Sequence, residues 1–253
     1  MLKTISVTNQ KGGVAKTTTA IHLASGIARS KPESQVLLID LDSQRNATSV
    51  LLQKGNFDVE QTVYPIFQKK PLSSSQIHST HLENLKCIPS SLQLVEIESL
   101  LANSLDGFFR LNEGIERARS EFQYIIIDCP PSLSIITINA MVAANFLLIP
   151  LQISKFSIDG IQGILDAVST VKKRYNPHLE IMGGLLTMFN PRTTLARVTR
   201  PEIQKHMHIF ETTIPKSVSV EEAHLLKKDL FEYAPKSKVT MAYKKVVEEV
   251  INV

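Results

Sequence analysis

The stretch "VTNQKGGVAKTTTA", Val7 to Ala20, joins a short apolar segment to a helix-forming segment through a pair of glycines. It approaches the phosphate-binding pattern G-x-x-x-x-G-K-[ST], but Gln10 and Ala15 stand at the two glycine positions of that pattern. Gly12 and Gly13 permit a tight backbone path whose N–H groups point inward, and the start of the following helix adds the positive end of its dipole. The stretch therefore predicts an anion-binding loop.

Two side chains after the glycines give this loop its expected chemistry. Lys16 at the helix start can reach the β- and γ-phosphates of a nucleotide, and Thr17 can offer its hydroxyl to Mg²⁺. Taken alone, the segment also fits an ordinary glycine turn followed by a solvent-exposed lysine, because short glycine patterns occur in many unrelated proteins. The rest of the chain has to decide between a nucleotide site and a simple turn.

Length and composition limit the class of protein. The chain has 253 residues, of which 43% are hydrophobic and 21% are charged, and we expect one globular domain covering residues 1–253. It contains no run of about eighteen apolar residues and no signal-peptide pattern, which favours a soluble, cytoplasmic protein. Cys87 and Cys129 are far apart in the sequence, so we expect two buried thiols and no metal site between them.

Apolar segments with strand character alternate with segments of helical period. We expect strands at "LKTISVT", "QVLLID", "YIIIDCP", "FLLIPLQ" and "LEIMGGLLTM", each followed by a helix. This alternation predicts a three-layer α/β fold, in which a mostly parallel, twisted sheet carries helices on both faces. The continuously apolar strands agree, because strands of such sheets are buried on both sides. Residues 56–85 form the least regular part, and "KKPLSSSQ" within it is expected to be a surface loop.

Three aspartates stand at the ends of predicted strands, where ligands bind in such folds. Asp40 and Asp42 end the segment "LLIDLD", and Asp128 ends "YIIID". A carboxylate beside an apolar core is costly unless it has a partner, and a hydrated Mg²⁺ is one such partner. Each aspartate alone could be a helix cap or a turn residue. Three of them together with the glycine loop and Lys16 favour a nucleotide site.

The same segments resemble those of a known family. "NQKGGVAKTTTAIHLA", with Lys11 ahead of the glycines, is similar to the deviant Walker A loop of the ParA/MinD ATPases, which have a P-loop NTPase fold. "LLIDLDSQRNAT" resembles the second loop of that family, and "YIIIDCPPSLSIITINAM" resembles its Walker B strand and the following helix. "LLIPLQISKFSIDGI", "LLTMFNPRTTLA" and the segment from Thr212 to Tyr243 extend the likeness over nearly the whole chain. It is closest to the short chromosome- and plasmid-partitioning ParA proteins of the Soj type.

The resemblance implies an Mg-ATP-dependent ATPase that acts as a timed switch in DNA segregation. ATP would be held by Lys11, Gly12, Gly13, Val14, Ala15, Lys16, Thr17 and Thr18 of the first loop, with Asn190, Pro215 and Lys216 near the adenine. Thr17, Asp40 and Asp128 would serve the metal. The implied catalytic residues are Lys11, Lys16 and Asp42: Lys11 would reach across an ATP-bound homodimer to the partner's phosphates, and Asp42 would orient the attacking water.

Two departures from the family pattern bear on this activity. The usual D-x-D-P-Q-G-N reads here as the segment from Asp40 to Asn46, which loses a proline and a glycine, and Arg45 could add a contact or crowd one. In the first loop Gln10 is ordinary for the partitioning proteins, so Ala15 remains as the anomaly. A methyl group there is strained at positive φ and tolerable at negative φ. We predict negative φ at Ala15 and retained phosphate binding.

Charge is distributed unevenly along the chain. Residues 169–253 contain 14 basic and 9 acidic side chains and carry a net charge of +5, against −1 for residues 1–168. The resemblance implies that the ATP-bound dimer binds DNA without sequence preference, associates with the nucleoid and is stimulated by a ParB-type protein. Contacts of lysine and arginine with phosphates would suit such binding. The candidates are Arg197, Arg200, Lys205, Lys216, Lys227, Lys228, Lys236 and Lys238.

Other functions stay open at this point. A MinD-like ATPase that cycles on membranes needs an amphipathic basic C-terminal helix with bulky apolar anchors. The segment "YKKVVEEVINV" contains Glu248 and Glu249, so we expect that helix to pack against the domain, with no stable membrane association. A reductase resembling the nitrogenase iron protein would need a second cysteine to accompany Cys129. A nucleotide-binding scaffold with weak hydrolysis is the third alternative, because the second loop is altered.

Overall fold

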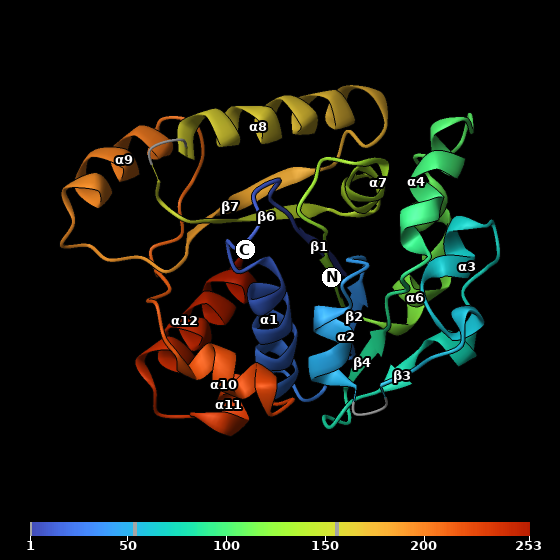
Figure 1. Cartoon of the computed structure of the whole chain (residues 1–253), viewed down its shortest axis with the longest axis horizontal. Coiled ribbons are helices and arrows are strands. Elements are labelled where there is room, and N and C mark those ends of the chain that lie inside the picture. Colours follow the sequence, from blue (N-terminus) through green and yellow to red (C-terminus); the bar gives the residue numbers. More distant parts are fainter. Residues whose placement is uncertain (1, 53–54, 155–156) are drawn as a thin grey trace.

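The computed structural model describes residues 2–52, 55–154 and 157–253. These residues contain a seven-stranded sheet in the order β3-β4-β2-β5-β1-β6-β7 (Figure 1). Its strands are β1 (Lys3–Val7), β2 (Val36–Asp40), β3 (His78–Ser79), β4 (Leu85–Ile88), β5 (Tyr124–Asp128), β6 (Phe146–Leu151) and β7 (Glu180–Leu186). Every neighbouring pair is parallel except β3 with β4. The predicted, mostly parallel sheet is confirmed.

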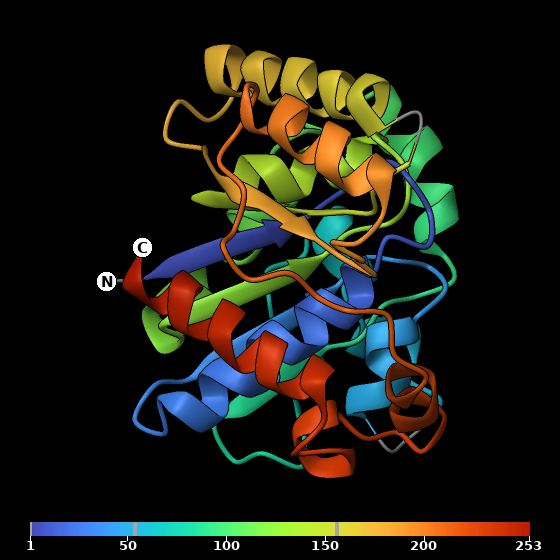
Figure 2. The same ribbon diagram turned by 90° about the vertical axis from the view of Figure 1, so that its left-hand side faces the viewer.

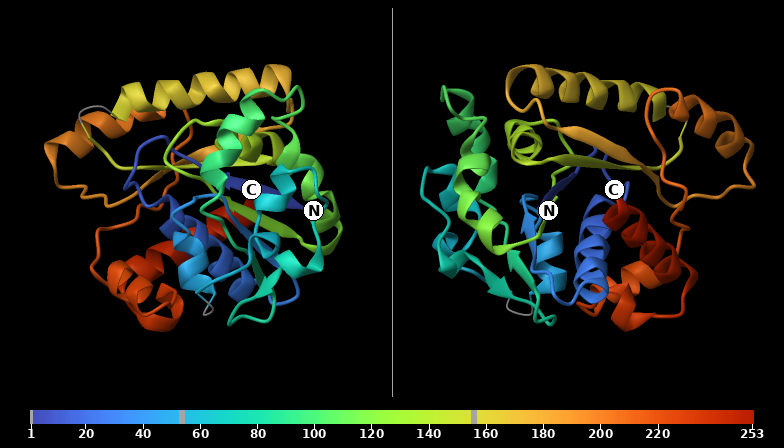
Figure 3. Two further views of the ribbon diagram at one scale, coloured as in Figure 1. Left: turned by 45° about the vertical axis from the view of Figure 1, so that its right-hand side comes forward. Right: turned by 180° about the vertical axis from the view of Figure 1, so that it is seen from behind.

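Helices cover both faces of the sheet, as predicted. One face carries α1 (Lys16–Ser30), α2 (Asn46–Leu51), α10 (Ser219–Leu225), α11 (Leu230–Tyr233) and α12 (Lys238–Asn252). The other face carries α3 (Tyr64–Phe67), α4 (Leu94–Ala102), α5 (Arg110–Gly114), α6 (Glu116–Glu121), α7 (Ile135–Ala143), α8 (Ser157–Arg174) and α9 (Thr194–Gln204). Figure 3 shows these layers from two further sides. Two short 3₁₀ helices, η1 (Val59–Gln61) and η2 (Ser74–Gln76), lie in the irregular region.

The central strands are buried on both faces because successive side chains point in opposite directions. Leu38 of β2 and Ile126 of β5 pack into the core beneath α1 and α12. Leu37 and Ile125, one residue earlier in each strand, pack into the core on the side of α4 and α7. Alternation of this kind explains why these strands have continuously apolar sequences. Both cysteines are buried free thiols, as predicted.

The register of the sheet determines which segments meet at its carboxyl edge. Val7 at the end of β1 is paired with Asp128 at the end of β5, and Asp40 at the end of β2 is paired with the same Asp128. The loop that follows β1 and the loop that follows β2 therefore emerge side by side, with Asp128 between them. This edge is where ligands bind in open parallel sheets.

The C-terminal helix packs against the domain, as predicted, and its main contact is with α1. Val239, Tyr243, Val246 and Val250 of α12 are buried, and Figure 2 shows α12 lying along the outer side of α1. Its apolar stripe is therefore covered by protein. In the described ranges, no helix combines the length and the apolar character needed to cross a bilayer.

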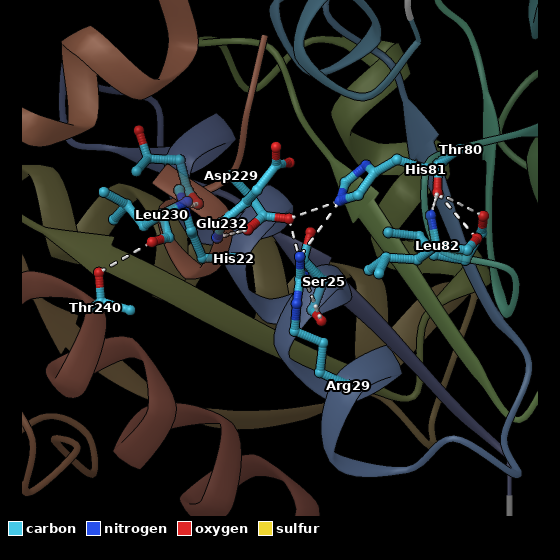
Figure 4. A network of polar contacts seen from close by, with 12 residues as sticks. His22, Ser25, Arg29, Thr80, His81, Leu82, Asp229, Leu230, Glu232 and Thr240 are labelled. Atoms are coloured by element: carbon cyan, nitrogen blue, oxygen red, sulfur yellow. Dashed lines mark hydrogen bonds and ion pairs between the residues drawn. The ribbon is translucent and has the colours of Figure 1, made fainter. Parts of the chain in front are cut away.

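A buried histidine ties α1 to the C-terminal segment. His22 Nδ1 donates to the carbonyl oxygen of Thr18 at 2.6 Å, because a carbonyl can only accept, and Nε2 accepts from the N–H of Leu230 at 2.9 Å. The ring also stacks on Tyr243, with 4.8 Å between ring centroids. These contacts fix one neutral tautomer, and through them the side chain links α1, α11 and α12 (Figure 4).

A cluster of charged side chains lies next to His22. Asp229 is fully buried, and its Oδ2 accepts from Arg29 at 2.9 Å and lies 3.1 Å from Nε2 of His81. Burial alone would raise the pKa of Asp229, but the hydrogen bond to His81 and the charge of Arg29 hold it below its usual range. Figure 4 shows how the cluster joins α1, the segment after β3 and the start of α11.

His22 should make the protein less stable in acid. Burial lowers its pKa to about 4, whereas the unfolded chain takes up the proton near pH 6.5. The stability contributed by His22 is therefore complete above pH 6.5 and is lost as the pH falls from there to about 4. Linkage gives a loss of about 3 kcal/mol in the free energy of unfolding. Urea denaturation of the parent and of His22→Gln between pH 7 and pH 4 measures this difference in slope.

The exposed His206 provides the control. His206→Gln should keep the pH dependence of the parent, while His22→Gln should flatten it. Parallel stability profiles for the parent and His22→Gln would show that the buried ring does not titrate in this way.

Candidate functional site

The loop after β1 has a backbone shaped to bind an anion. Gly13 has φ 72°, and Ala15, directly before α1, has φ 65° and ψ 35°. The prediction of a negative φ at Ala15 is therefore wrong. Left-handed residues between right-handed ones turn successive N–H groups toward one point and form an anion-binding nest. The common direction of the N–H groups requires left-handed backbone at residue 15, and this conformation is strained for alanine because of its methyl group.

The loop after β2 repeats this feature. Arg45, the residue before α2, has φ 56° and ψ 34°, and its N–H donates to the carbonyl oxygen of Asp42 at 2.8 Å. Arg45 stands where the family pattern has glycine, so both loops carry a side chain on left-handed backbone.

The two lysines of the first loop differ in their surroundings. Lys16 is only 6% exposed, and its Nζ donates to the carbonyl oxygen of Lys11 at 3.0 Å. Burial lowers the pKa of Lys16, while the charges of Asp128 and Asp42 act in the opposite direction. Lys11 is exposed, and its Nζ donates to the hydroxyl of Ser154 at 3.3 Å. Lys16 therefore points into the loop and Lys11 lies at the surface.

Asp40 organises the second loop. It is fully buried, and Oδ1 accepts from the N–H of Asp42 at 3.0 Å, while Oδ2 accepts from the N–H and the hydroxyl of Thr48 at 2.9 and 2.8 Å. Burial raises the pKa of Asp40 to about 6, against the effect of the bonds from Thr48. The sequence placed Asp40 with the metal ligands. In the structure both of its oxygens bind the protein's own groups, and it positions Asp42 and the start of α2.

Asp128 has the opposite character. It is fully buried, and within the described part of the chain neither carboxylate oxygen has a hydrogen-bond partner. Burial and the neighbouring Asp40 raise its pKa well above the usual range, while the Thr17 hydroxyl, which lies nearby without forming a hydrogen bond of normal geometry, and the charge of Lys16 oppose the rise. An unpaired buried carboxylate is costly. A hydrated divalent cation fits this site, because it would supply the missing partner next to the Thr17 hydroxyl.

Two adjoining cavities surround the first loop. The larger, about 560 Å³, is lined by Gly12, Gly13, Ala15, Lys16, Thr17, Thr18, Asp42, Gln44, Asn46, Ser49, Val50, Pro131 and His224. The smaller, about 270 Å³, is lined by Gly13, Ala15, Thr18, Met188, Ile214, Pro215, Lys216, Ser217, Val218, Val220, Glu221, His224 and Tyr243. We call them the phosphate cavity and the base cavity, after the parts of ATP that the sequence predicts beside their residues. The first is lined by Lys16 and Asp42, and the second, which also has Lys216 and Glu221 in its lining, is the more apolar of the two.

Most residues predicted to bind ATP line one of these cavities, but Lys11, Val14 and Asn190 line neither, and the predicted metal residues Asp40 and Asp128 lie outside both linings. Val14 of the first loop is buried, and its carbonyl accepts from the Thr187 hydroxyl at 3.0 Å. Asn190 does not line the base cavity, and its side-chain oxygen instead accepts from the N–H of Arg192. Met188 takes that place, because the chain turns at this residue (φ 48°) before it reaches Asn190. Met188 and His224 were not predicted, and no local pattern in the sequence marks them.

Comparisons with known proteins agree with this arrangement. A family model described as an AAA domain matches residues 2–181. The chain is 39% identical over 253 residues to the sporulation initiation inhibitor protein Soj of Bacillus subtilis (strain 168), covering 99% of this chain and 98% of the relative. It is 36% identical over 241 residues to the chromosome partitioning protein ParA of Myxococcus xanthus (strain DK1622), covering 94% and 84% of the two chains. The chain belongs to the Soj/ParA family of ATPases.

A solved structure shares the fold of this Soj/ParA family member. The crystal structure of cobyrinic acid a,c-diamide synthase from Mycobacterium smegmatis with bound ATP analog and magnesium superimposes with a TM-score of 0.83 at 26% identity. The match covers 100% of this chain and 95% of that one. A shared fold does not carry over the reaction, so the residues of the two cavities have to support the function.

The eight residues predicted to bind DNA are spread over the C-terminal region of this family member. They are Arg197, Arg200 and Lys205 on or just after α9, Lys216 at the base cavity, Lys227 and Lys228 after α10, and Lys236 and Lys238 at the start of α12. Lys205 pairs with Glu202, and Lys228 pairs with Glu232. Figure 2 shows α9 and α12 on the same side of the molecule. The candidates therefore come from several elements of the C-terminal region.

One groove is lined by two of these cations. Lys236 and Lys238 line it together with Lys245, and its volume is about 590 Å³. Lys245 was not predicted, although its position seven residues after Lys238 puts both side chains on the same face of a helix. We call this site the lysine groove.

Restoring glycine at residue 15 should stabilise the protein. Left-handed backbone costs an alanine about 1 kcal/mol more than it costs a glycine, so Ala15→Gly should raise the free energy of unfolding by about that amount. Urea denaturation without nucleotide measures the change. Ala28→Gly, within α1, is the control and should lower the same quantity by at least about 1 kcal/mol. A loss of stability in Ala15→Gly would contradict the strain at this residue.

Proposed function

We propose that the protein is an Mg-ATP-dependent, dimerising switch for DNA segregation, built as one ATPase domain over residues 1–253. The observation that carries the proposal is the sheet register, because it brings the nest of the first loop, Asp42 and the unpaired Asp128 to one edge. The named relatives act in chromosome partitioning and sporulation, which supports the segregation role.

ATP would lie across the two cavities. Its phosphates would accept from the backbone N–H groups around Gly12 and Gly13 and from Lys16, while the adenine would enter the base cavity beside Pro215 and Met188. The ammonium group of Lys16 and the N–H groups that line the phosphate cavity suit a triphosphate. When bound, Mg²⁺ would be held by the Thr17 hydroxyl and, directly or through water, by Asp128, and it would neutralise charge on the phosphates.

Hydrolysis would depend on positioning more than on a strong base. Asp42 is 8% exposed and lines the phosphate cavity, where its carboxylate can accept a hydrogen bond from the attacking water. Asp40 keeps Asp42 in place through the Asp42 N–H. Lys16 would stabilise the negative charge that develops on the transferred phosphoryl group.

Dimerisation would complete the site. Lys11 lies at the surface beside the phosphate cavity, so its ammonium group is available to a second subunit facing the same loop. Across a homodimer, each Lys11 would contact the partner's phosphates. Hydrolysis removes the γ-phosphate that both subunits hold, and the dimer would then loosen.

Non-specific DNA binding would place the dimer on the nucleoid. The lysine groove and the basic residues of α9 would contact backbone phosphates, which carry no sequence information. A ParB-type protein would stimulate hydrolysis and so release the dimer. The buried apolar stripe of α12 argues against the alternative of a membrane anchor at this helix.

The first test separates nucleotide binding from hydrolysis. Lys16→Ala should lower ATP affinity by roughly 10- to 100-fold, since it removes a charge-assisted hydrogen bond. Asp42→Ala should bind ATP nearly as well as the parent but hydrolyse it about 100-fold more slowly. Equilibrium binding and single-turnover hydrolysis measure the two effects. Lys70→Ala, at an exposed ion pair with Glu60, is the control and should change neither.

Each outcome has a clear opposite. Unchanged ATP affinity in Lys16→Ala would refute the phosphate-binding role of the first loop. Parental turnover in Asp42→Ala would move the water-positioning role to another residue. ATP binding without measurable turnover in the parent would favour the scaffold with weak hydrolysis.

The second test concerns DNA and membranes. The parent should bind DNA of any sequence only with ATP, and its affinity should fall steeply with salt. Replacing Lys236 and Lys238 together by alanine should weaken binding and make the log–log salt dependence shallower by about 2. Lys69→Ala and Lys70→Ala together form the control. Co-sedimentation with liposomes, with and without ATP, is run in parallel. ATP-independent DNA binding, or ATP-dependent liposome binding without DNA binding, would contradict the proposal.

A further inference from the structure

His224 of α10 lies where the phosphate cavity meets the base cavity. The two linings share four residues, namely Gly13, Ala15, Thr18 and His224. The first three belong to the first loop and to the start of α1. His224 is the contribution of the C-terminal segment to this boundary, about 200 positions further along the sequence.

The His224 ring is held in a defined orientation. It stacks on His22, with 5.9 Å between ring centroids and 13° between the ring planes. His22 in turn is fixed by its bonds to Thr18 and Leu230. The orientation of His224 is therefore set by a ring that is anchored to the helix of the first loop.

One nitrogen of this ring lacks a partner. Nε2 of His224 is buried and makes no hydrogen bond to any of the residues that the structure describes. Burial lowers the pKa of His224, so near neutral pH the ring is uncharged, with one N–H donor and one acceptor nitrogen. A buried polar atom without a partner is costly in a native protein, and its position at the mouth of both cavities points to a partner on a ligand.

A nucleotide that fills both cavities has to cross this boundary. Its terminal phosphates would occupy the phosphate cavity and its base the base cavity, so the ribose and the α-phosphate would lie at the four shared residues. Both groups present oxygens that accept hydrogen bonds. A neutral imidazole is suited to donate to such an oxygen.

We propose that His224 is a nucleotide-contacting residue and that a ring nitrogen hydrogen-bonds an oxygen of the ribose or the α-phosphate of ATP. The inference rests on the proposed function of the two cavities as an ATP site. The stack on His22 pre-orients the ring, so that little conformational freedom is lost on binding. Through this stack the C-terminal segment contributes directly to affinity for the nucleotide.

The test compares three substitutions in the full chain by equilibrium binding of ATP. His224→Phe keeps an aromatic ring on His22 but has no nitrogen, and it should lower ATP affinity about tenfold. His224→Gln keeps a hydrogen-bond donor and should recover part of that loss. His206→Phe, at an exposed position, is the control and should bind as the parent does. The nucleotide-free unfolding midpoint of His224→Phe should be equal to or above that of the parent, since the substitution removes a buried unpaired nitrogen.

Deoxynucleotides identify the oxygen that is contacted. If a ribose hydroxyl is the acceptor, the loss in His224→Phe disappears with 2′-deoxy-ATP or with 3′-deoxy-ATP. If the α-phosphate is the acceptor, the loss is the same for ATP and for both analogues. Either pattern supports the contact.

Three outcomes overturn it. If His224→Phe bound ATP as tightly as the parent, the proposed contact would be refuted, and the proposed function would be unaffected. Equal losses in the Phe and Gln variants would show that the ring acts through its shape and not through a hydrogen bond. Failure of the parent to bind ATP would overturn the proposed function, and this inference with it.

Discussion

Two fully buried carboxylates stand at paired positions of neighbouring strands, and the site is built around this constraint. The register of β2 and β5 pairs Asp40 with Asp128, and both side chains are fully buried. Two negative charges so close together in a medium of low dielectric repel strongly. The structure treats the two differently. Asp40 receives one hydrogen bond from Asp42 of the second loop and two from Thr48 of α2, whereas Asp128 receives none from the residues that the structure describes. One carboxylate thus shapes the protein, and the other keeps its binding capacity for a ligand.

The two loops beside this pair share a left-handed backbone conformation at a residue that is not glycine. Ala15 and Arg45 both occupy left-handed backbone directly before a helix. Strain of this size persists only where the surrounding structure fixes the chain, and it concentrates at functional sites. In the first loop the fixed elements are β1 and α1, which are buried on both sides of the turn. The packing of β1 and α1 therefore offsets the strain at Ala15, and the N–H groups of the loop keep their common direction.

The parts of the site that follow from local pattern could be predicted from the sequence. The strands are short apolar runs, and Asp42, Lys16 and Thr17 sit at fixed offsets from them, so their positions follow from the alternation of strands and helices. The conformation of Ala15 could not be inferred in the same way, because the orientation of the loop's N–H groups overrides the preference of a single residue. The partners of Asp40 were missed because Thr48 comes from the next helix. β4 was missed because its four residues lie at the end of the least regular region.

The base cavity was the hardest part to predict, and the reason bears on how the protein works. Its lining comes from the turn after β7, from residues 214–224 and from Tyr243 of α12, all brought onto α1 by long-range packing. No periodic pattern encodes such a meeting. The same packing gives α12 two functional sides, since Tyr243 faces the base cavity while Lys238 and Lys245 line the lysine groove. A nucleotide in the base cavity would contact the buried side of the helix whose exposed side carries these cations. If nucleotide binding favoured one position of α12, the lysines on its exposed side would shift with it. No further connecting element would be needed, because a packed helix moves as a unit. His22 ties α11 and α12 to α1 through its hydrogen bond from Leu230 and its stack on Tyr243.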